Sequence, residues 1–312
     1  MTASTELTVS VLLVVGPTAV GKTELSLALA LELGAEIVSL DSRQIYRGMD
    51  IGTAKPSPEE RRLVPHHLLD VADPDAVVTL ADIQVAAYAA IRAAHARGRP
   101  ALLVGGTGQY ARAVAEGWRI PPVTPDPEYR AELEALAARA GPGALFARLE
   151  RLDPVSAERI DRRNVRRVVR ALEVCRATGR PFSAMRSRRA PPYPILWLGL
   201  TRPREELYAR IDRRVEDMLE RGLEGEVRGL VGAGYGFDLP AMTGLGYGEW
   251  REYFGGAVDV AEVARRIRRN TRRLVRSQST WFRADDPRIR WFQASTTSAA
   301  DAVAWLARHR AG

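Results

Sequence analysis

The stretch GPTAVGKT at residues 16–23 constrains the fold more than any other feature of this 312-residue chain. The apolar run 9–15 before it has the pattern of a short buried strand, and residues 24–34 after it have the pattern of a helix that ends at a glycine. A strand, a glycine-rich loop, Gly-Lys-Thr and a helix form the sequence context of a phosphate-binding P-loop. The loop therefore predicts a parallel α/β sheet whose first strand ends at a phosphate site.

Within the loop, lysine and threonine have separate expected roles. Lys22 should neutralise phosphate oxygens, and the Thr23 hydroxyl suits Mg²⁺. Lys22 and Lys55 are the only lysines in a chain that otherwise uses arginine, and a compact ammonium fits among phosphate oxygens better than a planar guanidinium. The candidate diphosphate-binding residues are Gly16, Pro17, Thr18, Ala19, Val20, Gly21, Lys22 and Thr23.

Further strands are predicted at four places, with helical patterns between them, which favours a P-loop NTPase-like parallel sheet with helices on both faces. These strand candidates are residues 36–40, 101–104, 195–200 and 288–292.

The middle of the chain differs in character, because proline-rich linkers at 120–127 and 190–194 bound a segment with helical spacing and no convincing strand. We therefore expect a small all-helical insertion domain within the sheet domain. The expected divisions are 1–120 for the first part of the core, 121–194 for the insertion and 195–312 for the second part of the core.

Ligands of parallel sheets bind beyond the carboxyl ends of the strands, and two polar segments follow predicted strands there. Asp41 opens DSRQIYRGMDIGTAK after the second strand, where a carboxylate near phosphate is a magnesium partner or a general base. An Asp-Ser pair after a strand is equally typical of a turn or a helix N-cap. Thr107 in GGTGQY offers a hydroxyl after the third strand, and a turn explains the glycines of that segment but not Thr107 or Gln109.

Positive charge is concentrated in two helical segments of a chain with net charge +8 and a pI of about 10.0. This pattern favours a nucleic acid partner, with the two clusters flanking one groove, although arginine runs also occur on plain solvated helix faces. The clusters are Arg162, Arg163, Arg166, Arg167 and Arg170, and then Arg265, Arg266, Arg268, Arg269, Arg272, Arg273 and Arg276.

A third pair, Arg210 and Arg214, shares one face of a predicted helix. These two guanidiniums either point at the anion of the P-loop or pair with neighbouring acids.

Other sequence features exclude several classes of protein. The single cysteine, Cys175, excludes an intramolecular disulfide framework and fits a reducing cytoplasm. No apolar run approaches bilayer length, and residues 1–10 lack the pattern of a signal peptide, so we expect a cytoplasmic protein without a membrane partner. His66 and His67 are adjacent and diverge on any regular element, which argues against a zinc site.

Taken together, these motifs resemble the tRNA dimethylallyltransferase (isopentenyltransferase) family of bacterial type. GPTAVGKT, DSRQIYRGMDIGTAKP, PHHLLD, VGGTGQY, RRVVRALEV, RIDRRVEDMLERGL and SQSTWFR occur in the family's order along the whole chain. The family transfers a dimethylallyl group from dimethylallyl diphosphate to N6 of adenosine 37, beside the anticodon of tRNA, using Mg²⁺. By this resemblance the loop at 16–23 holds the pyrophosphate leaving group and hydrolyses no nucleotide.

The resemblance also implies roles for individual residues. Asp41 falls at the position of the base, Lys22 and Arg214 stabilise the leaving group, and Thr107 matters for catalysis and for tRNA contact. The residues that match tRNA-contacting positions are Asp41, Ser42, Arg43, Gln44, Thr107, Arg130, Arg166, Arg167, Val168, Val169, Arg170, Arg276, Ser277, Gln278, Ser279, Thr280, Trp281, Phe282 and Arg283. The chain departs from the family in AMTGLGYGEW, where Leu245 and Gly248 replace the usual residues, so the resemblance implies no tRNA contact for this segment. We expect a monomer.

Three rival functions share parts of this pattern. A P-loop nucleotide or small-molecule kinase explains the loop and the sheet but leaves the arginine clusters and the insertion without a role. An adenylate prenyltransferase that acts on free nucleotide leaves the same features idle. A non-catalytic RNA-binding protein does not need an intact Lys22, Thr23 and Asp41.

Overall fold

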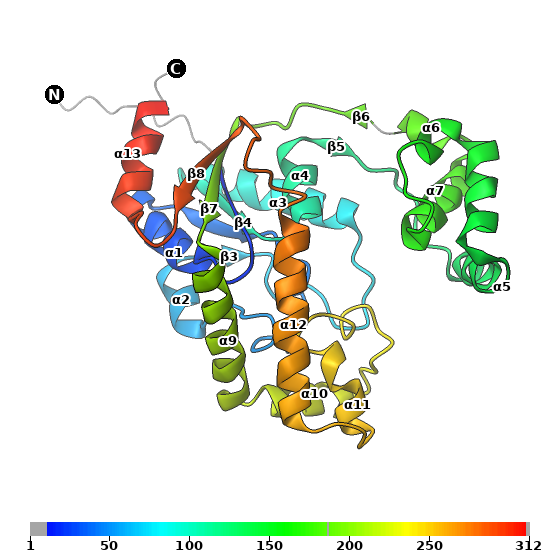
Figure 1. The fold of residues 1–312 in the computed structure, drawn as a ribbon. Coiled ribbons are helices and arrows are strands. Elements are labelled where there is room, and N and C mark those ends of the chain that lie inside the picture. The colour runs from blue at the N-terminus through cyan, green and yellow to red at the C-terminus, as the bar shows by residue number, and fades with distance from the viewer. Residues whose placement is uncertain (1–10, 186, 310–312) are drawn as a thin grey trace. The chain divides into compact units, whose positions relative to one another are not determined.

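A computed structural model describes residues 11–185 and 187–309. Six parallel strands form one sheet in the order β3-β2-β4-β1-β7-β8 (Figure 1). Their bounds are β1 (Val11–Val15), β2 (Glu36–Ser39), β3 (His66–His67), β4 (Ala101–Gly105), β7 (Ile195–Thr201) and β8 (Ile289–Gln293). Because Val15 pairs with both Gly105 and Gly199, the ends of three strands meet where the P-loop begins.

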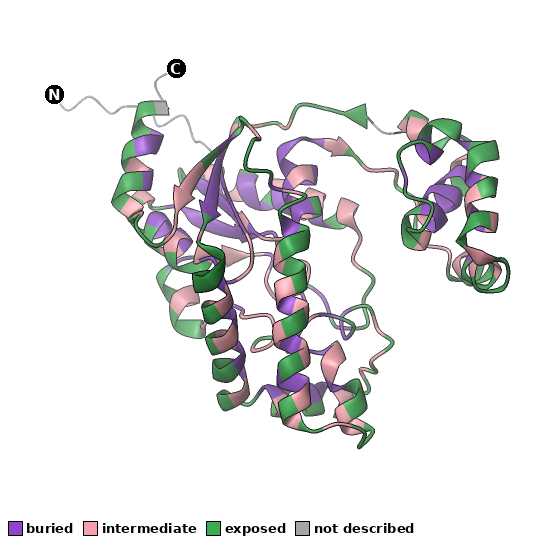
Figure 2. Cartoon of the chain, viewed as in Figure 1, coloured by how far each residue is buried: buried purple, intermediate pink, exposed green. Residues whose placement is uncertain are grey.

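Helices cover both faces of this sheet, and the alternation of side chains along β1 decides which face each residue reaches. Leu13 and Val15 pack in a core with α3 (Leu80–Ala96) and α4 (Gly108–Ala115). Leu12 and Val14 pack in a second core with α1 (Lys22–Leu33), α9 (Arg204–Glu220) and α13 (Ala299–His309). Figure 2 shows the central strands as buried, as expected for a parallel sheet covered on both sides.

A third core lies beyond the carboxyl ends of the strands. It is formed by the second half of α9 and by α10 (Leu223–Gly232), η1 (Gly248–Trp250) and α12 (Val260–Gln278), with α11 (Arg251–Phe254) beside them. Tyr247 and Trp250 are completely buried there, together with Ile45 and Met49 of the segment after β2. This packing fixes the segment that carries Asp41. A short helix, α2 (Pro58–Leu63), follows that segment and starts at a capping box made by Ser57 and Glu60.

The chain divides into two compact units, and the smaller one spans Glu116–Ala190. Its helices are α5 (Pro127–Leu152), α6 (Pro154–Ala157), α7 (Val165–Thr178) and α8 (Phe182–Met185). They enclose a core of their own, in which Leu133, Leu145, Leu149 and Leu172 are fully buried. A short antiparallel ribbon, β5 (Trp118–Arg119) with β6 (Ser187–Arg188), closes this unit at its two chain ends.

This ribbon explains why the unit's ends differ from the insertion expected at 121–194. Pairing of Trp118 with Arg188 assigns residues 116–120 to the helical unit. Residues 191–194 belong instead to the sheet unit, where the Tyr193 ring contacts His95 of α3. The sequence did not predict these boundaries, because strands of two residues have no recognisable pattern and the Tyr193–His95 contact joins residues far apart in the chain.

Where the structure describes them, the predicted strands agree with the observed ones to within one residue at each end; residues 9 and 10 of the first predicted strand lie outside the described residues. β3 was not predicted, because two adjacent histidines carry no strand pattern; it is defined only by its pairing with Ile37 and Val38. Among the helices in the described part of the chain, none combines the length and the apolarity that crossing a membrane requires.

Candidate active site

The P-loop connects β1 to α1 through three residues with positive φ. Gly16 (φ 148°) approaches β7 so closely that a Cβ there would lie 2.7 Å from the carbonyl oxygen of Leu200. Gly21 (φ 113°) is the N-cap of α1 and supplies no side chain to cap it, and Ala19 (φ 63°) completes the turn. The first N–H groups of α1 are therefore available to an anion.

Two cations lie at this loop. Lys22 Nζ donates hydrogen bonds to the carbonyl oxygens of Gly16 (3.0 Å) and Pro17 (2.8 Å), and Arg214 Nη1 lies 3.5 Å from Thr18 Oγ1. Burial and, after it, the Arg214 guanidinium lower the pKa of Lys22 to about 7, although the Asp41 carboxylate opposes both effects. Two positive charges this close together favour an anion between them and the loop.

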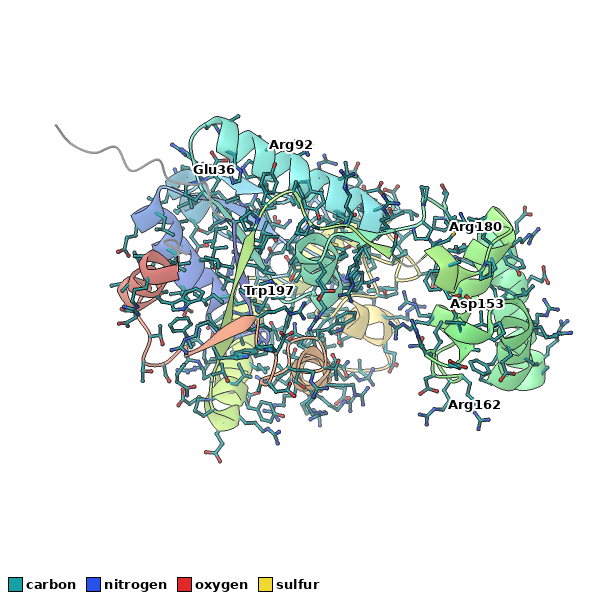
Figure 3. The ribbon with its side chains drawn as sticks, turned by 90° about the horizontal axis from the view of Figure 1, so that it is seen from above. Glu36, Arg92, Asp153, Arg162, Arg180 and Trp197 are labelled. Carbon is teal, nitrogen blue, oxygen red and sulfur yellow. The ribbon has the colours of Figure 1, made fainter. Side chains whose placement is uncertain are left out.

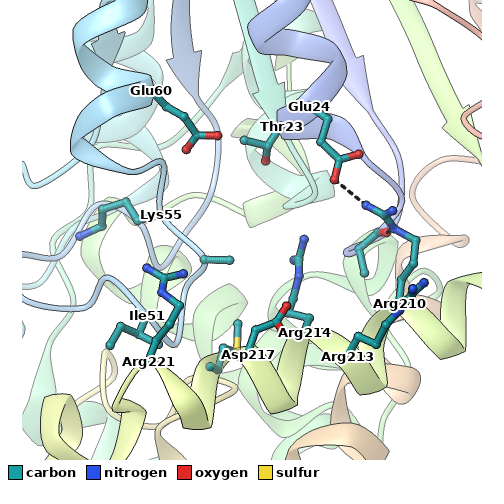
Figure 4. A pocket seen from close by; sticks show the side chains of 13 residues that line it. Thr23, Glu24, Ile51, Lys55, Glu60, Arg210, Arg213, Arg214, Asp217 and Arg221 are labelled. Carbon is teal, nitrogen blue, oxygen red and sulfur yellow. Dashed lines mark hydrogen bonds and ion pairs between the residues drawn. The ribbon is translucent and has the colours of Figure 1, made fainter.

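A cavity of about 490 Å³ opens beside the loop and is lined by residues of α1, α2, α9 and the segment around Ile51 (Figure 4). Arg210 and Arg214 both line this cavity, but only Arg214 points toward Thr18 of the P-loop. Arg210 donates to Glu24 Oε1 (2.6 Å) and to the Ala19 carbonyl (2.8 Å), so the acid pairing that the sequence left open applies to Arg210.

The same cavity holds the candidate magnesium ligand. Thr23 is exposed at its wall, and no residue in the described part of the chain forms a hydrogen bond with its hydroxyl. No group of three or more His, Cys, Asp or Glu side chains suited to a metal occurs among the residues described. Mg²⁺ commonly binds through one or two protein oxygens together with phosphate oxygens and water, so a single hydroxyl beside a phosphate loop fits this ion.

Asp41 lies directly after β2, at the same edge of the sheet. Its Oδ1 accepts the backbone N–H groups of Arg43 (2.8 Å) and Gln44 (3.3 Å), so the turn-cap interpretation is right for this oxygen. Oδ2 receives no hydrogen bond from the residues that the structure describes. Thr107 Oγ1, at the end of β4, accepts the N–H of Ser42 (3.2 Å) and so joins the two strand ends. One oxygen of Asp41 therefore caps the turn, while the other has no hydrogen-bond partner among the described residues.

Arg43 and Gln44 form hydrogen bonds within the protein. Arg43 Nη1 donates to the carbonyl oxygens of Pro240 and Ala241, in the loop where the sequence departs from the family. Gln44 accepts from Ser39 Oγ (2.9 Å) through its carbonyl oxygen, and its amide NH₂ donates to backbone carbonyls further along the segment. Their contact with tRNA stays a prediction.

The segment 276–283 has both exposed and buried residues. Gln278 and Phe282 are buried, and Trp281 packs against Gly108 so tightly that a Cβ there would collide with its ring. The exposed residues, which remain candidates for tRNA contact, are Arg276, Ser277, Ser279, Thr280 and Arg283. Burial removes the Phe282 side chain from the expected RNA surface.

The arginines of α12 fall into two classes. Four of them form ion pairs with acids: Arg265, Arg266, Arg268 and Arg272. Arg269, Arg273 and Arg276, which we call the α12 stripe, are exposed and have no ion-pair or hydrogen-bond partner for their side chains among residues 11–185 and 187–309. Their spacing of four and three residues places them on one face of the helix.

The helical unit shows the same division. Arg130 and Arg170 both bind the buried Glu173 carboxylate. Although burial alone would raise it, these bonds and the Asp126 N–H lower the pKa of Glu173 to about 2. Arg130 and Arg170 therefore help to hold the unit together, whatever their part in RNA binding.

Two expected RNA contacts in this unit need correction. Val168 and Val169 are almost completely buried in its helical core, so their side chains cannot lie at an RNA surface. They were predicted to contact tRNA because they lie between arginines in RRVVRALEV, but on α7 their side chains face the helical core. Arg162, Arg166 and Arg167 are exposed and have no ion-pair partner in the described part of the unit; Figure 3 shows Arg162 at its periphery.

Sequence reasoning missed Glu226 of α10. Its carboxylate accepts the backbone N–H groups of Asp50 (2.9 Å), Ile51 (2.7 Å) and Gly52 (3.1 Å) and the Tyr247 hydroxyl (2.6 Å). Since Ile51 lines the cavity, this carboxylate fixes one of its walls. No local pattern marks Glu226, because its backbone partners lie more than 170 residues away along the chain.

Comparison with known proteins agrees with these observations. A family model described as IPP transferase matches residues 44–285, and one described as isopentenyl transferase matches residues 9–71. A tRNA dimethylallyltransferase of Chloroflexus aurantiacus is 55% identical over 270 residues, which cover 86% of this chain and 91% of the relative. One from a Roseiflexus species is 54% identical, with 86% and 88% covered. A crystal structure of the tRNA isopentenylpyrophosphate transferase of Bacillus halodurans superposes with a TM-score of 0.72 at 40% identity and covers 97% of both chains.

Proposed function

The chain belongs to the IPP transferase family, and from this premise we propose that it transfers a dimethylallyl group from dimethylallyl diphosphate to N6 of adenosine 37 in tRNA. The bond between the prenyl carbon and the diphosphate oxygen breaks, and a carbon–nitrogen bond to the adenine amino group forms. Pyrophosphate leaves, and the amino group loses one proton.

The P-loop serves the leaving group. Pyrophosphate gains negative charge as the carbon–oxygen bond breaks, and preorganised donors at that point lower the barrier. The N–H groups at the start of α1, Lys22 and Arg214 supply this stabilisation. The Thr23 hydroxyl would hold Mg²⁺, which would supply Lewis-acid stabilisation of the phosphate oxygens.

Asp41 serves the nucleophile. An adenine amino group is a poor nucleophile, so a base within hydrogen-bond reach must remove its proton as the new bond forms. Oδ2 accepts this proton while Oδ1 keeps the turn in place through the Arg43 and Gln44 N–H groups. The target base has to leave its stack to reach Asp41, as in other enzymes that act on bases.

One arrangement carries the proposal: at the edge of the sheet where the P-loop begins, Asp41 presents an oxygen, Oδ2, that no described residue bonds, and Thr107 joins its turn to the end of β4, the neighbour of β1. A non-catalytic RNA-binding protein needs neither this carboxylate oxygen nor an intact Lys22. The unpaired arginines of the α12 stripe further support a polyanionic substrate larger than a free nucleotide.

The deciding experiment incubates the protein with labelled dimethylallyl diphosphate, Mg²⁺ and an anticodon stem-loop, with adenosine or guanosine at position 37. We expect label to enter only the adenosine stem-loop, and we expect Lys22→Ala and Thr23→Ala each to slow the transfer. ATP hydrolysis that depends on Lys22 and needs no RNA would instead support the kinase.

We also propose that the protein acts as a monomer in the cytoplasm, where its tRNA substrate is found. The lone Cys175 is buried, which argues against a disulfide-linked dimer. Light scattering after size exclusion tests the monomer: a mass of about twice 34.4 kDa at working concentration contradicts it.

A further inference from the structure

Gln278, the last residue of α12, connects three parts of the site. It is 7% exposed, and its carbonyl oxygen accepts the backbone N–H of Thr18 in the P-loop at 2.9 Å. Its amide nitrogen donates to the carbonyl oxygen of Gly106, just before Thr107, also at 2.9 Å. These contacts span 260 and 172 residues of sequence.

Only an amide side chain suits both partners. The same group must accept from an N–H and donate to a carbonyl, which a carboxylate or an aliphatic side chain of equal length cannot do. The approach to the strand end is also close: a Cβ on Gly106 would lie 2.6 Å from the Gln278 amide nitrogen. A side chain at this position would displace the Gln278 amide from its hydrogen bond to Gly106, so the glycine allows this close contact.

We propose that Gln278 is a positioning residue that sets the P-loop against the strand end carrying Thr107, and that it is not a tRNA-contacting residue. This inference rests on the proposed function, because it assigns the loop to the diphosphate and Thr107 to the transfer. The Thr18 N–H holds its place in the loop through the Gln278 oxygen, and Arg214 meets the side chain of the same threonine. Loss of the Gln278 amide therefore removes the hydrogen bond that holds Thr18 in place. The loop is then less well ordered at the point where its N–H groups and Arg214 bind pyrophosphate.

The test compares two affinities of Gln278→Met, which keeps side-chain length and removes both hydrogen bonds. Calorimetry measures binding of inorganic pyrophosphate with Mg²⁺ in the absence of RNA, and fluorescence titration measures binding of the anticodon stem-loop. We expect pyrophosphate to bind about tenfold more weakly, the effect of leaving one buried N–H unsatisfied at the site, and stem-loop affinity to change less than about twofold. Weaker stem-loop binding with unchanged pyrophosphate binding would overturn the proposal in favour of tRNA contact.

Gln84→Leu is the matched control, because the Gln84 amide also donates to a backbone carbonyl, that of Ala113, on helices outside the loop. We expect it to lower thermal stability while leaving pyrophosphate affinity unchanged. If both variants shift pyrophosphate affinity equally, Gln278 acts only on stability and the proposal fails.

Gln278→Glu keeps the measurement decisive if Gln278→Met folds poorly. The glutamate still accepts the Thr18 N–H but places a second oxygen against the Gly106 carbonyl oxygen, where Gln278 has its amide nitrogen. We therefore expect pyrophosphate to bind at least about tenfold more weakly. An unchanged pyrophosphate affinity overturns the proposal. Failure of the wild-type protein to transfer the prenyl group would count against the proposed function alone, because pyrophosphate binding is measured without RNA or transfer.

Discussion

Asp41 has two oxygens with different roles, and a single-atom change separates them. In Asp41→Asn, the side-chain oxygen still accepts the Arg43 and Gln44 N–H groups, because asparagine and aspartate serve equally well in such turns. The carboxylate that takes the proton is lost. We expect the rate of a single turnover to fall by about 10² or more, with tRNA and diphosphate affinities nearly unchanged.

Asp41→Ala provides the comparison, since it removes both the base and the turn cap. We expect it to transfer no faster than Asp41→Asn and to unfold at a lower urea concentration. A fall of less than tenfold in Asp41→Asn would show that Asp41 is only a turn residue and that another group is the base.

Lys22 should make diphosphate binding depend on pH. Its pKa of about 7 in the free protein, caused first by burial and then by Arg214, means that it loses its proton above neutrality. A bound diphosphate favours the ammonium, so the complex keeps the proton to higher pH. Dimethylallyl diphosphate affinity should fall by up to about tenfold per pH unit above about pH 7, where the phosphate groups are already largely ionised and their charge no longer changes.

Calorimetry without RNA, between about pH 6 and 9, measures this dependence. Lys22→Met should bind more weakly at all pH values and lose the decline above neutrality. A wild-type affinity that stays level across the whole range contradicts a lowered pKa for Lys22.

Among the elements, α10 acts on the site through one carboxylate. Glu226 holds the loop at Ile51, and burial together with Glu226 raises the pKa of Tyr247, so that its hydroxyl remains a donor to this carboxylate. In Glu226→Gln the acceptor loses its charge, and one of its oxygens is replaced by a donor facing backbone N–H groups. We expect the free energy of unfolding to fall by about 1–3 kcal/mol and the KM for dimethylallyl diphosphate to rise, because Ile51 lines the cavity.

Glu224→Gln is the control on the same helix, since Glu224 pairs with Arg228 and Tyr253 at the surface. It should change the unfolding free energy by less than about 1 kcal/mol and leave the KM unchanged. Urea denaturation and steady-state kinetics give both quantities. Equal effects of the two substitutions would contradict a specific role for Glu226 in the cavity wall.

The elements also show how far sequence reasoning extends. β1, β2, β4 and β7 were predictable because each is a largely apolar run of strand length, and the same runs predicted that Asp41 and Thr107 lie beyond strand ends; their catalytic roles stay predictions. Partners distant in sequence were not predictable. Glu226 and Gln278 receive their roles from backbone groups more than 170 residues away, and no periodicity in α10 or α12 distinguishes them from exposed neighbours.

At the scale of the whole molecule, pairing within the protein decides which arginines are available to RNA. The net charge of +8 and the two clusters predicted a nucleic acid partner, but Arg268 and Arg272 are occupied by acids of α9, and Arg130 and Arg170 by Glu173. The α12 stripe in the sheet unit and Arg162, Arg166 and Arg167 in the helical unit remain. The expectation that the two arginine clusters of the sequence flank one groove stays a prediction.

If both units bind the same tRNA through its phosphates, their unpaired arginines should contribute to one salt dependence. We expect Arg273→Ala with Arg276→Ala, and separately Arg166→Ala with Arg167→Ala, to lower the slope of log affinity against log salt by about two in each case, roughly one for each phosphate that is no longer neutralised. The four substitutions together should lower it by about four, with the rate at saturating tRNA nearly unchanged.

Arg268→Ala with Arg272→Ala removes the same net charge from paired positions and should change the slope little. Titration of a labelled stem-loop at several salt concentrations measures all four variants. An equal slope change in this control would mean that net charge alone determines affinity, and a change from only one unit's pair would restrict RNA binding to that unit.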